Sequence, residues 1–220
     1  MSKSKPFTPS NKQFDECIRW ALNPWVNAEN IYGGKKKGKK PKSLTLNEGQ
    51  TCKELWEKAK QDERKWGNDM INAINNNNWT TKLGEGIVYE LLSRLGKNPR
   101  YCIQKQRFKP DWETDDYIIE VKTSNWTVTG TTGEKVLGTP YKYSEIPELY
   151  GKPLKIICVA YQEWELTHGP TPVFGDVSAI KKEALEFWKN KGIEYVKFSD
   201  LIAELGTTQS AHQSSSKQDS

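Results

Sequence analysis

The feature that most constrains the fold is an apolar run that ends in a Glu-Val-Lys triplet at residues 120–122. It follows Pro110-Asp111 and a polar turn over residues 112–116. Because side chains alternate between the two faces of a strand, one face should carry Ile118, Glu120 and Lys122. The other face is wholly apolar and should pack on a core through Tyr117, Ile119 and Val121. The run therefore predicts a strand that presents a carboxylate and an amine together, with Asp111 nearby.

These groups can hold a hard divalent cation and position a water molecule beside it. Mg²⁺ prefers oxygen ligands and is usually held by one or two carboxylates together with phosphate oxygens and waters. The bound metal polarises a phosphoryl oxygen and lowers the pKa of its water. The alternative is a solvated ion pair on an edge strand, a common fate of charged residues two positions apart.

The spacing of Pro110-Asp111, eight residues and Glu120-Val121-Lys122 resembles the PD-(D/E)XK motif of type II restriction endonucleases and their relatives. The resemblance implies an α/β (α+β) fold whose central mixed sheet is flanked by helices in α-β-β-β-α-β order. It also implies that Asp111 and Glu120 bind Mg²⁺, that Lys122 orients and helps to deprotonate the attacking water, and that the products carry 5′-phosphate and 3′-hydroxyl ends.

A second informative stretch covers residues 83–96, where the apolar residues recur with a helical period. Glu85 falls on the side of Val88 and Leu92, whereas Glu90 points away from it. We therefore expect Glu85 to lean inward from the first turn of a core-facing helix. Acidic residues also favour first turns because of the helix dipole, which is the alternative explanation. The stretch resembles the first motif of the same nucleases, which implies that Glu85 completes the metal site directly or through water.

Residues 1–79 are expected to form an N-terminal helical elaboration, with helices at 12–22 and 49–75. Between them, residues 33–42 contain six lysines and no apolar side chain, which predicts a mobile basic loop. Lys36 and Lys39 would contact DNA phosphates there. A nuclear-import signal or a solubilising loop are the alternatives.

The nuclease core is expected at residues 80–206, with an insertion at 123–153 and a disordered polar tail at 207–220. The insertion is rich in Thr, Gly, Asn and Lys and begins directly after Lys122. Such side chains suit contacts to phosphates and base edges, so we expect DNA contacts from Asn125, Lys135 and Lys142. The alternative is a structural surface excursion. A short helix at 141–150 would be broken by Pro147.

The remaining elements of the predicted order follow from shorter patterns. We expect a strand at 101–108, a buried central strand at 154–161, a helix at 177–191 and a strand at 193–198. Ser199 should begin a last helix that runs through Leu205.

Composition narrows the class of protein further. A net charge of +5 permits a polyanionic partner. With only two histidines, nucleases that use a histidine base are excluded. The four cysteines are widely spaced and are expected to be reduced thiols of a cytoplasmic protein. We expect no secretory signal and no membrane span, since no run approaches ~20 apolar residues.

The combined expectation is a Mg²⁺-dependent endonuclease that cuts double-stranded DNA, most similar to a type II restriction enzyme. A repair or junction nuclease, a catalytically inactive DNA-binding module and an αβ domain with coincidental charges are the alternatives. One site per chain cuts one strand, so we also expect a homodimer. Four tryptophans are candidates for either its interface or the core: Trp20, Trp25, Trp56 and Trp66.

Overall fold

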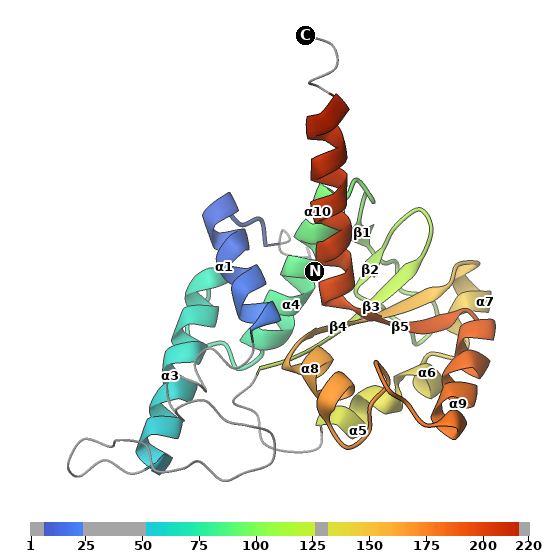
Figure 1. Ribbon diagram of the computed structural model, residues 1–220, viewed down its shortest axis with the longest axis horizontal. Helices are drawn as coiled ribbons and strands as arrows, with labels where there is room; N and C mark the ends of the chain where they lie inside the picture. Colours follow the sequence, from blue (N-terminus) through green and yellow to red (C-terminus); the bar gives the residue numbers. More distant parts are fainter. Residues whose placement is uncertain (1–6, 24–51, 126–131, 216–220) are drawn as a thin grey trace.

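A five-stranded mixed β-sheet flanked by helices organises the protein (Figure 1). The computed structural model describes residues 7–23, 52–125 and 132–215. The strands, in sequence and in sheet order, are β1 (Arg100–Tyr101), β2 (Trp112–Glu113), β3 (Ile118–Ser124), β4 (Leu154–Ala160) and β5 (Ile193–Lys197). Strands β1, β2 and β3 pair antiparallel, and β3, β4 and β5 pair parallel. The expected α/β class with a mixed central sheet is confirmed.

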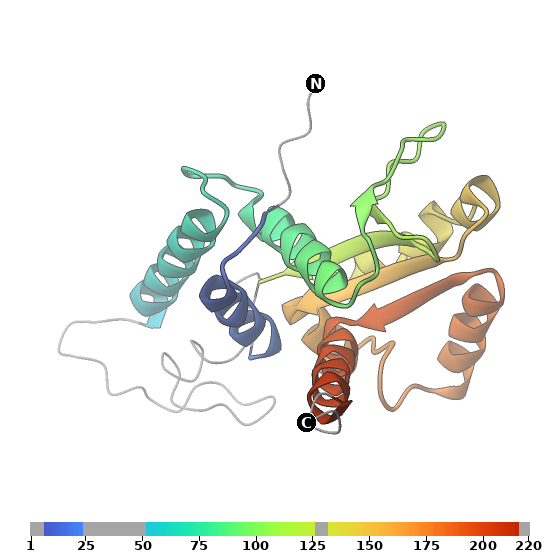
Figure 2. The same cartoon turned by 90° about the horizontal axis from the view of Figure 1, so that it is seen from above.

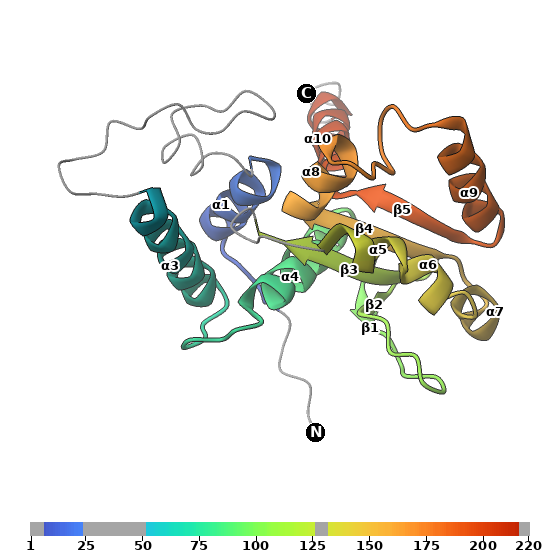
Figure 3. The same ribbon diagram turned by 90° about the horizontal axis from the view of Figure 1, so that it is seen from below.

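Helices cover both faces of this sheet. Three precede it: α1 (Asn11–Leu22), α3 (Cys52–Met70) and α4 (Trp79–Arg94). Between β3 and β4 lie α5 (Thr132–Leu137), α6 (Thr139–Lys142) and α7 (Ile146–Tyr150). The others are α8 (Tyr161–His168), α9 (Ala179–Asn190) and α10 (Phe198–Ser215). Helices α4 and α10 cross one face (Figure 2), and α5, α6 and α8 lie over the other (Figure 3). None of the helices described is long and apolar enough to cross a membrane.

The central strands are buried on both faces, which explains their apolar sequences. On β3, Ile119 and Val121 join the core cluster under α1 and α4, as the alternation predicts. Ile118 joins the second cluster, under α5 and α8. The predicted central strand at 154–161 is confirmed as β4, except that Tyr161 already begins α8. The predicted strand at 193–198 is confirmed as β5, and the predicted helix at 177–191 as α9.

Three predictions around the antiparallel strands are wrong. The strand expected at 101–108 is limited to Arg100–Tyr101, and the chain then turns through a hairpin closed by a Lys105–Phe108 bridge. The turn requires a positive φ of 52° at Gln106, which ends any extended run. Strand β2 lies inside the expected polar turn. The order of one helix, three strands, helices and a strand is formed by α4, β1, β2, β3, α5–α7 and β4, whereas the predicted order lacked β2 and placed α9 and β5 last.

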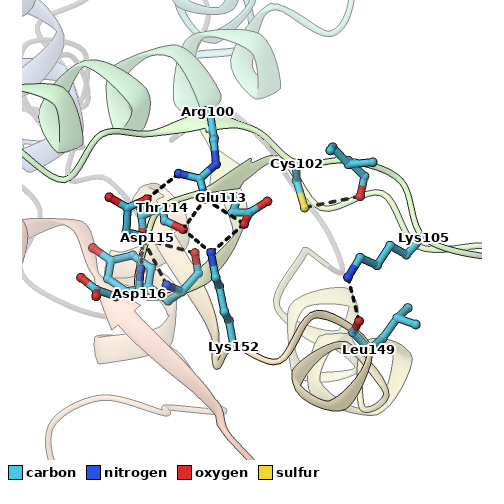
Figure 4. Close-up of polar contacts among 11 residues, drawn as sticks. Arg100, Cys102, Lys105, Glu113, Thr114, Asp115, Asp116, Leu149 and Lys152 are labelled. Atoms are coloured by element: carbon cyan, nitrogen blue, oxygen red, sulfur yellow. Dashed lines mark hydrogen bonds and ion pairs between the residues drawn. The ribbon is translucent and has the colours of Figure 1, made fainter.

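A network of charged side chains joins β1, β2 and the segment that precedes β4 (Figure 4). Arg100 bonds to Asp115 at 2.7 Å and to Glu113 at 3.0 Å. Lys152, at the start of β4, donates to the same Glu113 oxygen at 2.7 Å and to the Thr114 carbonyl at 2.8 Å. Although burial opposes it, these donors hold the pKa of Glu113 below its ordinary value. The short strand β2 is thus held by its side chains as well as by its backbone pairing with β1 and β3.

The N-terminal helices share a core with the sheet. Phe14, Cys17 and Trp20 of α1 pack in one cluster with Leu83 and Ile87 of α4. Trp20 is buried in the core, and the partly buried Trp66 packs against it, so Trp20 is not available as an interface. Trp25 lies outside the described residues, as does the Trp56 side chain. The expected boundary at residue 79 falls at the first residue of α4.

Two further expectations about flexible segments are corrected. The described part of the insertion at 123–153 is mostly helical, and it packs on the sheet through Val136, Tyr143 and Ile146. Pro147 lies in the first turn of α7, where proline is tolerated, and does not break a helix. The tail expected from residue 207 is helical through Ser215 as part of α10. The basic loop at 33–42 lies outside the described residues.

Helix α4 approaches β3 closely because residue 84 is glycine. A Cβ atom at Gly84 would lie 1.8 Å from Oγ1 of Thr123 on β3. We expect Gly84→Ala to lower the free energy of unfolding by about 1–3 kcal/mol, since overpacking must separate the two elements. Gly206→Ala in α10 is the matched control, because its Cβ would meet no atom within 4 Å. It should stabilise by up to about 1 kcal/mol through helix propensity. Equal effects in urea unfolding would contradict the close packing.

Candidate active site

The antiparallel pairing of β2 and β3 brings Asp111 beside Glu120. The Asp111 N–H donates to the carbonyl of Ile119 at 3.0 Å, and its Oδ2 accepts from the N–H of Val121 at 2.7 Å. The Asp111 carboxylate is therefore fixed against the backbone on either side of Glu120. The eight residues between Asp111 and Glu120 make this approach possible, because they include the turn between the two strands.

Glu120 is buried at 6% exposure and is hydrogen-bonded to two side chains. Its Oε1 accepts from Nζ of Lys122 at 2.6 Å and from the hydroxyl of Tyr143 at 3.0 Å. Both of these side-chain donors reach Oε1, so Oε2 can serve a cation. The carboxylate and amine predicted on one face of β3 are in direct contact.

Glu85 joins this group from the middle of α4. It is the seventh residue of a helix that begins at Trp79, so the expectation of a first-turn position is wrong. The sequence 79–82 continues the helix toward its N-terminus. The dipole explanation for Glu85 therefore fails, since that effect falls off within the first turn. The indole Nε1 of Trp112 donates to the Glu85 carbonyl at 3.0 Å, which ties α4 to the residue after Asp111.

The carboxyl groups of Glu85 and Asp111 lie close to that of Glu120 and influence each other's ionisation. Burial, followed by the charges of Glu120 and Glu85, raises the pKa of Asp111 well above its ordinary value. Burial and then the charge of Glu120 raise the pKa of Glu85, against the opposing effects of its hydrogen bond to Asp111 and of Lys122. Proton retention compensates for crowded negative charge, and a divalent cation would do the same.

The donor set fits Mg²⁺, whose ligands are oxygen atoms. Among the described residues, no three His, Cys, Asp or Glu side chains are arranged as a preformed metal site. Magnesium in proteins takes one or two carboxylates and completes its shell with waters and substrate phosphate. Asp111 and Glu120 are the residues that would hold it, with Glu85 acting beside them.

Tyr143 is a site residue that the sequence did not reveal. It follows α6, its side chain is 6% exposed, and its hydroxyl donates to Glu120. Burial and the neighbouring Glu120 raise its pKa, so it remains a neutral donor. Lys142 lies exposed next to it, with Nζ 3.2 Å from the Tyr143 hydroxyl. The insertion therefore contributes to the site itself.

The predicted DNA contacts have different outcomes. Lys135 on α5 and Lys142 on α6 are exposed, so their assignment stays a prediction. Asn125 is buried, and its Nδ2 donates to Oε2 of Glu63 on α3 at 2.8 Å, so we correct its assignment to a structural role. Glu63 also accepts from Nε1 of Trp20 at 2.9 Å. Lys36 and Lys39 lie outside the part of the chain that is described.

A cleft of about 800 Å³ opens beside the carboxylates and includes Glu85 and Asp111 in its lining. Its walls also carry two lysines that the sequence did not single out, Lys82 on α4 and Lys109 before Asp111. Glu85 and Asp111 are therefore accessible to a ligand from this side, whereas Glu120 and Lys122 are not part of the cleft lining.

Comparisons with family models, curated proteins and solved structures find no match. The resemblance to the nuclease motif consequently covers only the residues quoted for it. The functional interpretation depends on the geometry of Glu85, Asp111, Glu120 and Lys122.

Proposed function

We propose that this protein is a Mg²⁺-dependent endonuclease that hydrolyses phosphodiester bonds of DNA. One observation carries the proposal. Four residues from α4, the segment before β2, and β3 form one coupled cluster, Glu85, Asp111, Glu120 and Lys122, beside an open cleft. The net charge of +5 supports a polyanionic substrate.

Each residue has a distinct role in this proposal. Asp111 and Glu120 would hold Mg²⁺, which when bound acts as a Lewis acid and lowers the pKa of a bound water. Lys122 is held at Glu120 and orients the attacking water. Glu85 lies beside Asp111 on the cleft side of the site, where a bound cation would replace the proton that the crowded carboxyl groups retain. Tyr143 fixes the rotamer of Glu120 and leaves one oxygen for the cation.

The finer form of the proposal is a type II restriction endonuclease with a restriction-endonuclease-like core. The order of α4, β1, β2, β3, α5–α7 and β4 supports it together with the motif spacing. Such an enzyme cuts both strands of double-stranded DNA, which calls for two copies of the site. A homodimer supplies them with the commonest protein symmetry, and twofold symmetry matches a palindromic site.

Incubation of the protein with unmethylated plasmid and phage DNA in Mg²⁺ tests this function. We expect discrete fragments that ligate without repair, as 5′-phosphate and 3′-hydroxyl ends do. A continuous smear of fragments would support a nuclease without sequence specificity and would contradict the assignment as a restriction enzyme. DNA left intact by the wild-type protein with Mg²⁺ or Mn²⁺ would contradict the proposal. Sedimentation with and without DNA tests the homodimer. A protein that cleaves DNA but sediments with it as a monomer would contradict this part of the proposal.

Removal of the Tyr143 hydroxyl should weaken the site without removing a ligand. We expect Tyr143→Phe to raise the Mg²⁺ concentration for half-maximal cleavage about 10–100-fold, the usual cost of losing a partner that orients a ligand. Excess Mg²⁺ should restore much of the rate. Tyr141→Phe is the matched control, since Tyr141 is 80% exposed two residues away. A Tyr143→Phe enzyme with wild-type Mg²⁺ dependence would contradict this role.

A further inference from the structure

The cleft beside the carboxylates is bounded by segments from distant parts of the chain. One wall is formed by Phe7, Thr8 and the turn at residues 71–73. The other is formed by Tyr101 and residues 109–112. Glu85 and Asp111 are part of the lining, so a ligand in the cleft lies next to the proposed reaction centre.

The walls are held by close packing, so the cleft is present before a ligand binds. A Cβ atom at Gly86 would lie 2.7 Å from Cβ of Phe7, which shows that Phe7 rests directly on α4. The ring of Tyr101 packs on that of Trp112 with centroids 4.7 Å apart. Trp112 in turn is bonded to the backbone of Glu85.

The lining combines two kinds of side chain that a nucleotide needs. Lys82 and Lys109 are exposed cations and can pair with phosphate. Phe7, Ile71 and the half-buried Tyr101 offer apolar and aromatic surface. Alternating basic and aromatic groups of this kind bind single strands, because every base has a face that stacks on an aromatic ring.

The volume of the cleft indicates how much of a nucleic acid it can hold. About 800 Å³ lies within the range of pockets that enclose one ligand of small-molecule size. One nucleotide fits when it has left the base stack, as occurs in enzymes that take their target base out of the duplex.

We propose that this cleft receives one unpaired nucleotide of the cleaved strand next to the scissile phosphate, with Tyr101 stacked on the base and Lys82 and Lys109 paired with phosphates. The inference rests on the proposed nuclease function and specifies its substrate as DNA that is unpaired, or easily unpaired, at the cut. Extrusion of a base is least costly where the base is mismatched. The protein should therefore bind mismatched DNA more tightly than the same duplex fully paired.

The test uses the full chain with Asp111→Asn, which should not cleave, and fluorescence anisotropy without added metal. The probes are two labelled duplexes of one length that differ by one mismatched pair. We expect about tenfold tighter binding of the mismatched duplex. Adding Tyr101→Leu should abolish most of that preference, since stacking on one base accounts for it. Adding Tyr101→Phe, which keeps the ring, should retain it, as should the control Tyr141→Leu.

The lysines give an independent readout. Lys82→Ala and Lys109→Ala should each weaken the binding of both duplexes to the same extent. Each should also reduce the slope of log K against log salt concentration by about 0.9. Lys189→Ala on α9, whose helix packs on the opposite sheet face from α4, should leave this slope unchanged. Equal affinity for both duplexes, or full preference in a folded Tyr101→Leu protein, would overturn the inference and leave the nuclease proposal intact. Failure to bind or cut any DNA would instead overturn the proposed function.

Discussion

Replacing Lys122 with alanine is expected to lower the single-turnover rate of DNA cleavage by about 10²–10⁴-fold, the usual contribution of a positioned proton-transfer group. The physical reason is the contact of Lys122 Nζ with Glu120 at 2.6 Å, which holds an amine at the edge of the proposed metal site. DNA affinity measured by anisotropy should stay within a few-fold, since one ammonium contributes little to a whole DNA interface. A Lys122→Ala enzyme that cuts at the wild-type rate would remove Lys122 from the mechanism.

Helix α4 provides a matched pair of controls for the same experiment. Glu85 faces the cluster, whereas Glu90 bonds to Arg94 on the same helix at 2.8 Å. Both substitutions to glutamine preserve length and helix propensity. We expect Glu85→Gln to reduce cleavage strongly and Glu90→Gln to leave it within a few-fold of wild type. Equal losses would show that the effects arise from α4 as a whole and not from the position of Glu85 over the site.

The part of the site on β3 could be predicted from sequence because it depends on local geometry. Alternation along a strand fixes the relation of Glu120 to Lys122, and a turn of limited length fixes that of Asp111 to both. The position of Glu85 within its helix could not be predicted from local geometry alone. Its inward direction follows from the helical period, but its mid-helix position depends on where α4 begins, and a single apolar residue, Trp79, followed by three polar ones gives no clear period there.

The contacts that the sequence could not reveal join segments that are distant in the chain. Tyr143 reaches Glu120 across 23 residues, along a path of short helices too brief to show a period. Asn125 lies only three residues after Lys122, yet its partner Glu63 is 62 residues away on α3. A polar side chain beside the predicted site therefore looked like a DNA contact, although the N-terminal helices bury it.

Without divalent metal, the crowded carboxylates should make the protein less stable at neutral pH than at mildly acidic pH. The pKa values of Asp111 and Glu85 are raised in the folded state, so the folded state binds more protons than the unfolded state between the ordinary carboxyl pKa and these raised values. The free energy of unfolding consequently falls as the pH rises through that window. The pKa of Glu113 is lowered in the folded state, so its ionised form stabilises the fold. That stabilisation is lost as the pH falls below the ordinary carboxyl pKa. Urea unfolding across pH should therefore show a maximum in the mildly acidic range.

Asp111→Asn should abolish most of this dependence and reveal its origin. The amide can still accept the hydrogen bond from the Val121 N–H but adds no charge beside Glu120 and Glu85. We expect the metal-free variant to be more stable than wild type at neutral pH by about 1–2 kcal/mol, as for other sites that sacrifice stability for function. Saturating Mg²⁺ should stabilise wild type, by about 2.7 kcal/mol at a hundredfold excess over Kd, and should stabilise the variant far less. The exposed Asp116→Asn is the control and should change neither quantity. If Asp111→Asn destabilises the metal-free protein or keeps the full stabilisation by Mg²⁺, then charge crowding at Asp111 does not define a cation site.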